Sequence, residues 1–227
     1  ELQRYQSARG GELSDDDRIL VLDELVDQTL MALGAVDAGF ILEEQALQAR
    51  LDRLTEEMGG EEALAEWMAN NHYDQTTLHE ALKRSIAAAW MRDRISAGVP
   101  PTAEQAHARQ ILTFSQERAN EIYGQLQAGA DFATLASTFN PATSGDLGWF
   151  PRGVLPDPEI DQAVFSLEPG KFSPVIQTRS GYHILMLIEI VPDRPLDPMT
   201  LLALQKKAIE EWLRIRRSQA KIEVLIP

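Results

Sequence analysis

The chain has 227 residues, of which 44% are hydrophobic and 25% are charged, a composition typical of globular proteins with a sizeable core. This length fits one large domain or two modest ones. The net charge of −14 argues against binding along a nucleic-acid backbone or an anionic membrane surface. The absence of cysteine excludes disulfides, thiolate nucleophiles and cysteine-based zinc sites.

The acidic residues are concentrated in the first 100 positions, which hold 20 acidic and nine basic residues. Two interpretations are open: a solvated helical surface, or an acidic groove that binds basic, unfolded chains. The chain begins at Glu1 instead of Met and contains no run of 18 apolar residues. We therefore expect a processed form that lacks its signal or anchor segment.

Helical spacing of apolar residues predicts an all-helical block over residues 14–96. The acidic run at 15–17 suits a helix start, where the macrodipole favours negative charge, and Asp74 is a predicted N-cap. Gly59 with Gly60 ends one helical segment. The prolines at 100 and 101 then interrupt the pattern because proline lacks a backbone donor and disfavours the helical conformation before it. A domain boundary is expected there.

The middle of the chain reads as an α+β segment. Gly129 is a predicted helix end and Asp131 a predicted N-cap. The turn residues 179–181 separate two strand-like runs and predict a hairpin. The expected elements are a strand at 107–114, helices at 116–127, after 131 and near 159–165, and strands at 172–178 and 182–191.

The C-terminal segment returns to a helical pattern. Asp197 and Pro198 suit the N-cap and first position of a helix. An isolated helix of this length is marginal in water, so we expect it to pack on the N-terminal helices and to make the helical domain discontinuous. Residues 222–226 are expected to form an edge strand or a tail. The apolar stripe of this helix consists of Leu201, Leu204, Ala208, Trp212 and Ile215.

Several motifs between residues 107 and 191 occur in a recognisable order. They are His-Ala-Arg-Gln-Ile-Leu at 107–112, Gly-Ala-Asp-Phe at 129–132, Gly-Asp-Leu-Gly-Trp-Phe at 145–150, Ala-Val-Phe at 163–165, Leu-x-Pro-Gly at 167–170 and Gly-Tyr-His-Ile at 181–184. This part of the chain resembles the parvulin-type peptidyl-prolyl cis/trans isomerases. The flanking helical segments resemble those of the extracytoplasmic chaperone-isomerases related to SurA and PrsA.

The resemblance implies a two-domain α+β protein. A helical chaperone-like domain at residues 1–100 is completed by the helix and tail at 196–227, and a parvulin domain at 101–195, a small antiparallel sheet surrounded by helices, is inserted between them. The implied activity is extracytoplasmic assistance of protein folding. The implied partners are unfolded or nascent polypeptides that contain X-Pro bonds, and nucleic acid is not among them. A homodimer is left open.

Prolyl isomerisation sets a physical task that needs no cofactor or metal. Rotation about the X-Pro bond faces a barrier of roughly 18–20 kcal/mol, whereas its two ground states differ by only about 0.5–1 kcal/mol. Catalysis therefore means stabilising a twisted amide, which requires an apolar pocket for the proline ring and a few polar groups near the rotating carbonyl.

The resemblance assigns the apolar pocket to five positions: Leu147, Phe150, Leu155, Ile160 and Phe165. The alternative that such residues merely pack the domain is most open for Phe150. Leu155 and Ile160 match the family pattern only with a one-residue shift.

The resemblance also assigns five polar positions as catalytic. His183 lies on the last strand, Thr178 matches its hydrogen-bond partner, and Ser180 matches a position at the pocket rim; the alternative for His183 is a satisfied core histidine. Gln110 replaces a family histidine and does not titrate. Asn140 replaces an acid or a cysteine and lacks the negative charge. Both departures predict attenuated catalysis.

The sequence gives only weak signals for a metal site or a hydrolase triad. His72 and His79 lie in the acidic block near Glu80, but a metal site would need further ligands. A hydrolase triad of Asp146, Ser144 and His183 lacks a nucleophile elbow.

The sequence is compatible with three functions: an isomerase that is also a chaperone, a non-catalytic holdase with a degenerate parvulin domain, and a cytoplasmic maturation factor for one client. The loop at 113–117 lacks an Arg/Lys cluster, so a preference for phosphorylated X-Pro is not expected.

Overall fold

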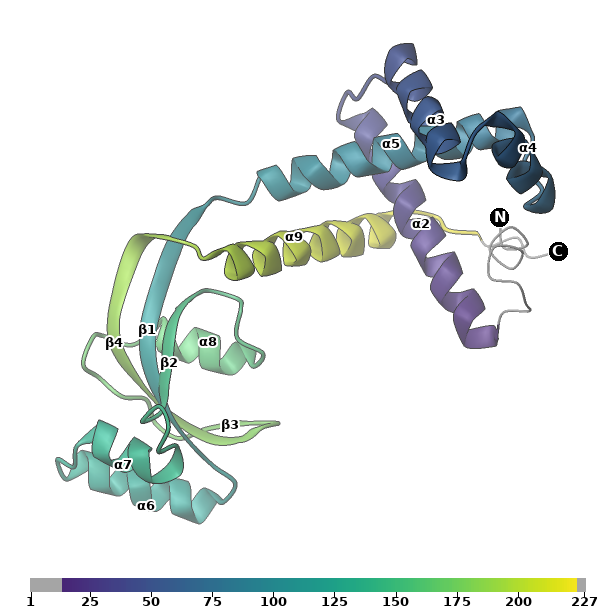
Figure 1. Ribbon diagram of the computed structural model, residues 1–227. Coiled ribbons are helices and arrows are strands. Elements are labelled where there is room, and N and C mark those ends of the chain that lie inside the picture. The colour runs from purple at the N-terminus through teal and green to yellow at the C-terminus, as the bar shows by residue number, and fades with distance from the viewer. Residues whose placement is uncertain (1–13, 224–227) are drawn as a thin grey trace. The chain divides into compact units, whose positions relative to one another are not determined.

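The computed structural model describes residues 14–223 (Figure 1). The described residues divide into two compact units, a helical unit of residues 14–99 and 205–223 and a sheet unit of residues 100–204. The fold class is α+β, as expected. In chain order the elements are α2 (Asp15–Asp37), α3 (Glu44–Met58), α4 (Glu61–Asn70), α5 (Gln75–Ala97), β1 (Thr102–Thr113), α6 (Gln116–Gln127), α7 (Phe132–Phe139), β2 (Asp146–Pro151), α8 (Pro158–Val164), β3 (Ile176–Thr178), β4 (Gly181–Pro195) and α9 (Pro198–Gln219).

The helices of the helical unit begin and end at local capping signals. Ser14 caps α2 by accepting a hydrogen bond from the Asp17 N–H, and Asp74 forms a capping box with Thr77 at the start of α5. Helix α3 ends at Gly59, whose φ of 95° is a left-handed conformation that suits glycine. The predicted cap at Asp74 and stop at Gly59 are confirmed.

Helix α4 is not among the elements that the sequence pattern singles out. It has only ten residues, and Leu64 is its one buried side chain. Leu64, Trp67 and Met68 make a single group at i, i+3 and i+4, which is too short to stand out as a period.

Helix α9 packs against α2 and α5 in the helical unit. The Trp212 ring lies so close to α2 that a Cβ atom at Gly34 would come within 2.5 Å of it. Met31 and Ala35 of α2 and Met91 of α5 form the buried side of this contact. Glycine at position 34 therefore permits the close approach of the two helices.

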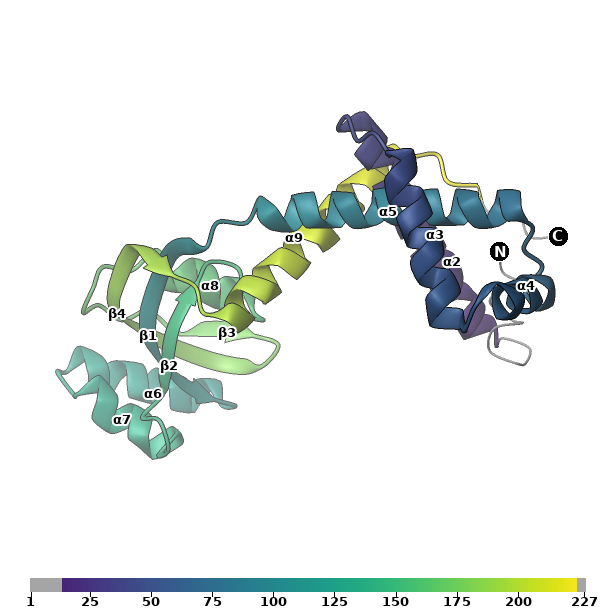
Figure 2. The same ribbon diagram turned by 45° about the horizontal axis from the view of Figure 1, so that its top comes forward.

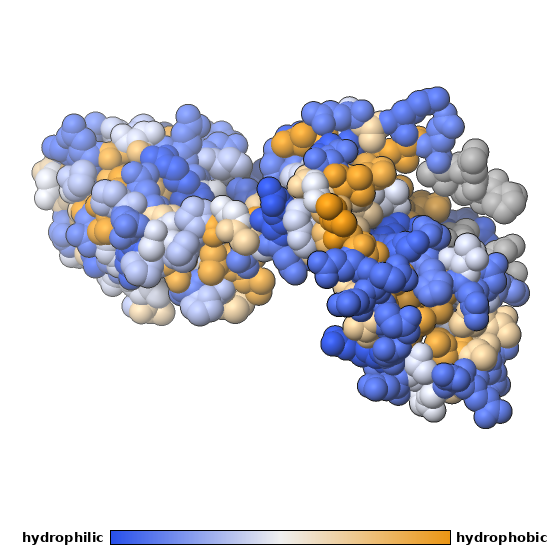
Figure 3. All heavy atoms as spheres, turned by 90° about the horizontal axis from the view of Figure 1, so that it is seen from above, coloured by the Kyte–Doolittle hydropathy of each residue, from blue (hydrophilic) through white to orange (hydrophobic). Residues whose placement is uncertain are grey.

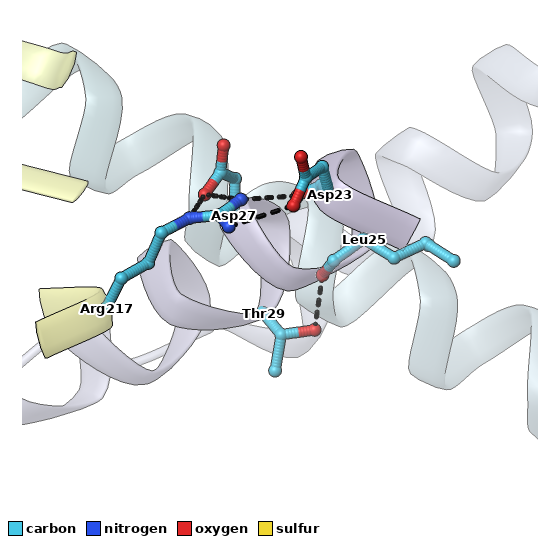
Figure 4. A network of polar contacts seen from close by, with 5 residues as sticks. All are labelled: Asp23, Leu25, Asp27, Thr29 and Arg217. Atoms are coloured by element: carbon cyan, nitrogen blue, oxygen red, sulfur yellow. Dashed lines mark hydrogen bonds and ion pairs between the residues drawn. The ribbon is translucent and has the colours of Figure 1, made fainter. Parts of the chain in front are cut away.

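The polar edge of this contact is an arginine between two aspartates (Figure 4). The Arg217 guanidinium of α9 donates to Asp27 at 2.7 Å and to Asp23 at 2.9 Å, both on α2. In the same view the Thr29 hydroxyl donates to the Leu25 carbonyl, one turn earlier on α2. The pKa of Arg217 is raised by these hydrogen bonds to Asp27 and Asp23.

The predicted apolar stripe of α9 is correct at its centre and wrong at its end. Trp212 joins the helical core, but Ile215 is 42% exposed. Ile209 and Leu213 take part in the core instead. They lie three positions before and one position after Trp212, on the face that α9 turns toward α2 and α5. The predicted cap is confirmed, because Asp197 accepts hydrogen bonds from the N–H groups of residues 199 and 200.

The sheet unit is built on an antiparallel sheet of order β2-β1-β4-β3. Strand alternation sends side chains to two faces. Ala108 and Leu185 pack against α8, whereas Ile111 and Ile184 pack against α6 and α7. Figures 1 and 2 show α8 apart from the α6 and α7 pair, consistent with this division. Each face has its own buried cluster.

Several boundaries in the sheet unit differ from the expected ones. Helix α6 has the predicted bounds, but β1 begins five residues earlier than expected, at Thr102. Strand β3 is reduced to three residues, because Pro174 lacks an N–H and Phe172 makes only an isolated bridge to Met186. Residues 196–204 belong to the sheet unit, and Leu196 donates to the Pro101 carbonyl.

The predicted C-terminal strand at 222–226 falls largely outside the described residues, and residues 221–223 have no regular secondary structure. Within residues 14–223, no helix is long and apolar enough to cross a membrane. Hydrophobic residues reach the surface of the helical unit between hydrophilic ones on the face seen in Figure 3. The exposed large apolar residues of this unit include Ile19, Leu20, Leu33, Val36 and Ile41.

Candidate active site

The strand register brings the predicted histidine and glutamine to the same face of the sheet. On β4, His183 and Leu185 alternate onto the face that packs against α8. Their direct partners on β1 are Leu112 and Gln110, respectively. Gln110 and His183 are therefore diagonal neighbours on one face, as the site assignment requires.

His183 is buried, with 2% of its surface exposed, and lies at the centre of a short hydrogen-bond chain. Its Nε2 is 2.8 Å from Oγ1 of Thr178, and the Ser180 N–H donates to the same Oγ1 at 3.0 Å. Its Nδ1 is buried and has no hydrogen-bond partner among the described residues. Gln110, at the family's second histidine position, does not bond to this nitrogen. The His183 ring is therefore hydrogen-bonded at Nε2, to Thr178, and has no hydrogen-bond partner among the described residues at Nδ1.

Asp157 extends this chain to the surface, and sequence reasoning missed it. It occupies the N-cap position of α8, yet its side chain makes no capping hydrogen bond. Its carboxylate instead accepts a hydrogen bond from the Ser180 hydroxyl at 3.0 Å. The segment before α8 and the β3–β4 turn are joined by this bond. An aspartate before a proline indicates a helix start and carries no signal of such a long-range partner.

Gln110, Asn140 and Leu147 line a cavity of about 230 Å³ next to the Gly-Asp-Leu-Gly motif. The Gln110 N–H donates to the Gly145 carbonyl at 2.8 Å. Gly145 has a φ of 73°, and a Cβ atom there would collide with the Gln110 carbonyl oxygen. Glycine is therefore required at 145. Asn140 follows α7, is exposed and lines the cavity, and its Oδ1 accepts a hydrogen bond from the Thr143 N–H at 3.4 Å.

The five predicted pocket residues share one apolar cluster over this face of the sheet. Phe150, Ile160 and Phe165 are buried, whereas Leu147 and Leu155 are partly exposed. The rings of Phe150 and Phe165 meet edge to face, with centroids 6.0 Å apart. Leu147 and Leu155 thus keep part of their apolar surface exposed, whereas Phe150 and Ile160 lie in the buried part of the same cluster.

An arginine lies over the Phe165 ring of this cluster. The Arg152 guanidinium lies 4.1 Å from the centroid of the Phe165 ring and donates to Glu104 at 2.9 Å. The ion pair orients the guanidinium over the ring face, where a cation is attracted by the π electrons. Arg152 is a second residue that sequence reasoning missed.

A separate hydrogen bond explains the aspartate of the Gly-Asp-Leu-Gly motif. Asp146 is 2.8 Å from His107 Nε2 and accepts a hydrogen bond from the Gly148 N–H at 2.7 Å. Burial raises its pKa, but the hydrogen bonds from Gly148 and His107 outweigh burial and lower the pKa overall. Ser144 bonds to the Ser137 hydroxyl. Asp146 and Ser144 therefore have other partners than His183, which argues against the hydrolase triad.

The described residues contain no group of three or more His, Asp or Glu side chains placed to hold a metal ion. The predicted catalytic residues instead form two polar sets beside the apolar cluster. One set is His183, Thr178 and Ser180, and the other is Gln110 and Asn140.

The family comparison matches the part of the chain that carries this site. Residues 99–189 match the rotamase family model, the PPIC-type PPIase domain. Residues 99–189 form a parvulin-type domain. The match begins just before β1 and ends within β4, so this parvulin domain contains every predicted site residue.

Curated relatives extend the similarity. The foldase protein PrsA of Caldanaerobacter subterraneus is 38% identical over 115 residues, which cover 48% of this chain and 35% of that protein. The chaperone SurA of Legionella pneumophila is 30% identical over 146 residues, covering 53% and 33%. The chain thus spans between a third and two fifths of the length of such relatives.

A solved structure matches both units. The crystal structure of a peptidyl-prolyl isomerase, PrsA, from Bacillus cereus aligns with a TM-score of 0.57 and 21% identity. The alignment covers 95% of this chain and 91% of that one. The parvulin domain and its helical flanks therefore share the fold of a PrsA protein.

The buried histidine predicts how the stability of the parvulin domain depends on pH. Burial lowers the pKa of His183 below 6.5, and nearby Asp157 opposes this only in part. Below about pH 6.5 the unfolded chain therefore binds a proton that the folded chain does not, and stability falls as the pH falls toward the lowered pKa. Urea unfolding at pH 7.5 and pH 5 should show a smaller loss of stability in His183→Gln than in the wild type. Equal losses would contradict a neutral, buried His183.

Proposed function

We propose that the chain is a peptidyl-prolyl cis/trans isomerase with chaperone activity, which assists the folding of extracytoplasmic proteins. The observation that carries this proposal is the position of the apolar surface of Leu147 and Leu155 on the face that holds His183. A proline ring fits an apolar surface, and the carbonyl of the residue before it needs polar neighbours while the amide twists.

The proposed catalysis has no covalent step. Leu147, Leu155 and the edge of Phe165 take the proline ring out of water, which favours an amide with weakened resonance and a smaller dipole. The amides of Gln110 and Asn140 donate hydrogen bonds to the carbonyl as it rotates. The hydrogen-bonded pair of His183 and Thr178 forms the base of the proposed site. The hydrogen bond from Ser180 to Asp157 connects the β3–β4 turn with the segment before α8 at its edge.

The proposed clients are unfolded polypeptides with unphosphorylated X-Pro bonds. Two properties support a role beyond catalysis: the similarity to proteins named foldase and chaperone, and the exposed apolar residues of the helical unit. Action outside the cytoplasm rests on the resemblance to the PrsA and SurA group.

A second candidate is a holdase with a degenerate parvulin domain. Two observations favour it: His183 Nδ1 has no partner among the described residues, and neither Gln110 nor Asn140 can titrate or carry charge. No described feature favours a maturation factor for a single client.

A protease-coupled assay with an unphosphorylated X-Pro tetrapeptide separates the two candidates. We expect the wild type to accelerate isomerisation weakly. Gln110→His supplies a partner for His183, and Asn140→Asp supplies a negative charge, so each should raise kcat/KM by about three- to tenfold, the effect of one ordinary hydrogen bond worth roughly 0.7–1.4 kcal/mol. Thermal melts of all three proteins control for folding. A wild type that suppresses client aggregation but leaves the isomerisation rate unchanged would instead establish the holdase.

A further inference from the structure

The helical unit contains a groove of about 700 Å³ between α3, α4 and the start of α5, lined by residues of this unit alone. This volume lies within the range of ligand sites, roughly 300–1,000 Å³. No residue of the candidate active site lines the groove.

The floor of the groove is apolar and belongs to a packed core cluster. Leu51, Met68, Tyr73 and Leu78 line it, and all four belong to the cluster that packs α3, α4 and α5 together. Tyr73 also stacks on Trp67, with ring centroids 5.3 Å apart and planes at 15°. The floor is therefore a preformed edge of the core.

The rim of the groove is acidic. Asp52, Glu61 and Asp74 line it from α3, α4 and the start of α5, and none of the described lining residues is a lysine or an arginine. Arg50, the nearest arginine along α3 from Leu51, pairs with Glu57 at 3.7 Å. Three carboxylates therefore line the groove, and its described lining holds no lysine or arginine and one histidine, His79. Asp52 and Asp74 also accept hydrogen bonds from Gln48 and Thr77.

We propose that this groove binds short apolar segments of unfolded chains that carry lysine or arginine. The occupant follows from charge complementarity: apolar side chains cover the floor while a cationic group reaches the carboxylates at the rim. This inference rests on the proposed chaperone function and names the class of segment that the helical unit selects.

The test uses the full chain and a fluorescein-labelled octapeptide of Leu, Phe, Lys and Arg without proline, so that prolyl isomerisation plays no part. Fluorescence anisotropy should show binding that weakens as salt rises. A matched peptide with Glu in place of Lys and Arg should bind at least about tenfold more weakly, since it replaces attraction with repulsion at several carboxylates.

Two pairs of variants locate the binding. Glu61→Lys at the rim should weaken binding by about fivefold, the effect expected of a partly exposed charge, whereas Glu62→Lys on the same helix should not. Ala65→Trp fills the groove and should reduce binding at least about tenfold, whereas Ala49→Trp on exposed α3 surface should not. Circular dichroism melts confirm that each variant is folded.

Equal affinity for the basic and acidic peptides would overturn the proposal, as would equal effects of Ala65→Trp and Ala49→Trp. The X-Pro tetrapeptide assay on the same variants keeps the two proposals apart, because none of these substitutions lies in the parvulin domain. Loss of octapeptide binding with unchanged isomerisation supports the groove, and absence of isomerisation with intact octapeptide binding counts only against the enzyme.

Discussion

Replacing Trp212 with alanine is expected to lower the free energy of unfolding of the helical unit by about 2–3 kcal/mol. This lies at or below the lower end of the roughly 3–5 kcal/mol typical of truncating a buried aromatic side chain, because this ring is only half-buried. The ring fills the space above Gly34 and contacts the core formed by α2 and α5. Gly34 has no side chain that could fill the space left by the ring.

Amide hydrogen exchange measures this effect by region. Protection should fall across residues 19–95 and stay unchanged over residues 102–191, which belong to the other unit. Ile215→Ala is the matched control, because Ile215 is exposed on the same helix. Equal destabilisation of residues 19–95 by Trp212→Ala and Ile215→Ala would show that the packing of Trp212 does not stabilise the helical unit.

Replacing Leu147 with alanine is expected to lower kcat/KM for X-Pro peptides by about tenfold, which corresponds to losing roughly 1.4 kcal/mol, or half the value of burying a leucine side chain. Leu147 is the partly exposed member of the apolar cluster that also lines the cavity with Gln110 and Asn140. Its truncation removes surface from the proline ring and admits water beside the twisted amide.

Leu202→Ala is the control for this substitution, because it removes the same atoms from an exposed position outside the site. Its kcat/KM should equal that of the wild type. A stopped-flow, protease-coupled assay with an X-Pro tetrapeptide measures kcat/KM of both variants under the same conditions. Equal activity of Leu147→Ala and Leu202→Ala would remove Leu147 from the proline pocket.

Elements with strong local signals could be predicted from the sequence. Helix α6 has its predicted bounds, with the Ser115 side chain accepting from the Arg118 N–H at its start. The caps at Asp131 and Asp197 also act as predicted. Each signal lies within three residues of the backbone groups that it satisfies, so no knowledge of tertiary structure is needed.

Features that depend on distant partners could not be predicted. The bond from Ser180 to Asp157 spans 23 positions, and the hydrogen bond between His107 and Asp146 spans 39. Each of these residues has an ordinary local explanation as a cap, turn or strand residue. The family resemblance supplied the list of site residues, but it contained no information on the open Nδ1 of His183, which depends on what Gln110 contacts in this chain.

The central claim is that this parvulin domain accelerates rotation about X-Pro bonds. NMR exchange spectroscopy on an unphosphorylated X-Pro peptide measures that rotation directly, because cis and trans forms give separate signals and interconvert alone in about 10–100 s. With a catalytic amount of the full chain, we predict exchange cross-peaks that grow faster than in peptide alone and slow again with Leu147→Ala. Cross-peaks at the uncatalysed rate, with the peptide visibly bound, would contradict the claim.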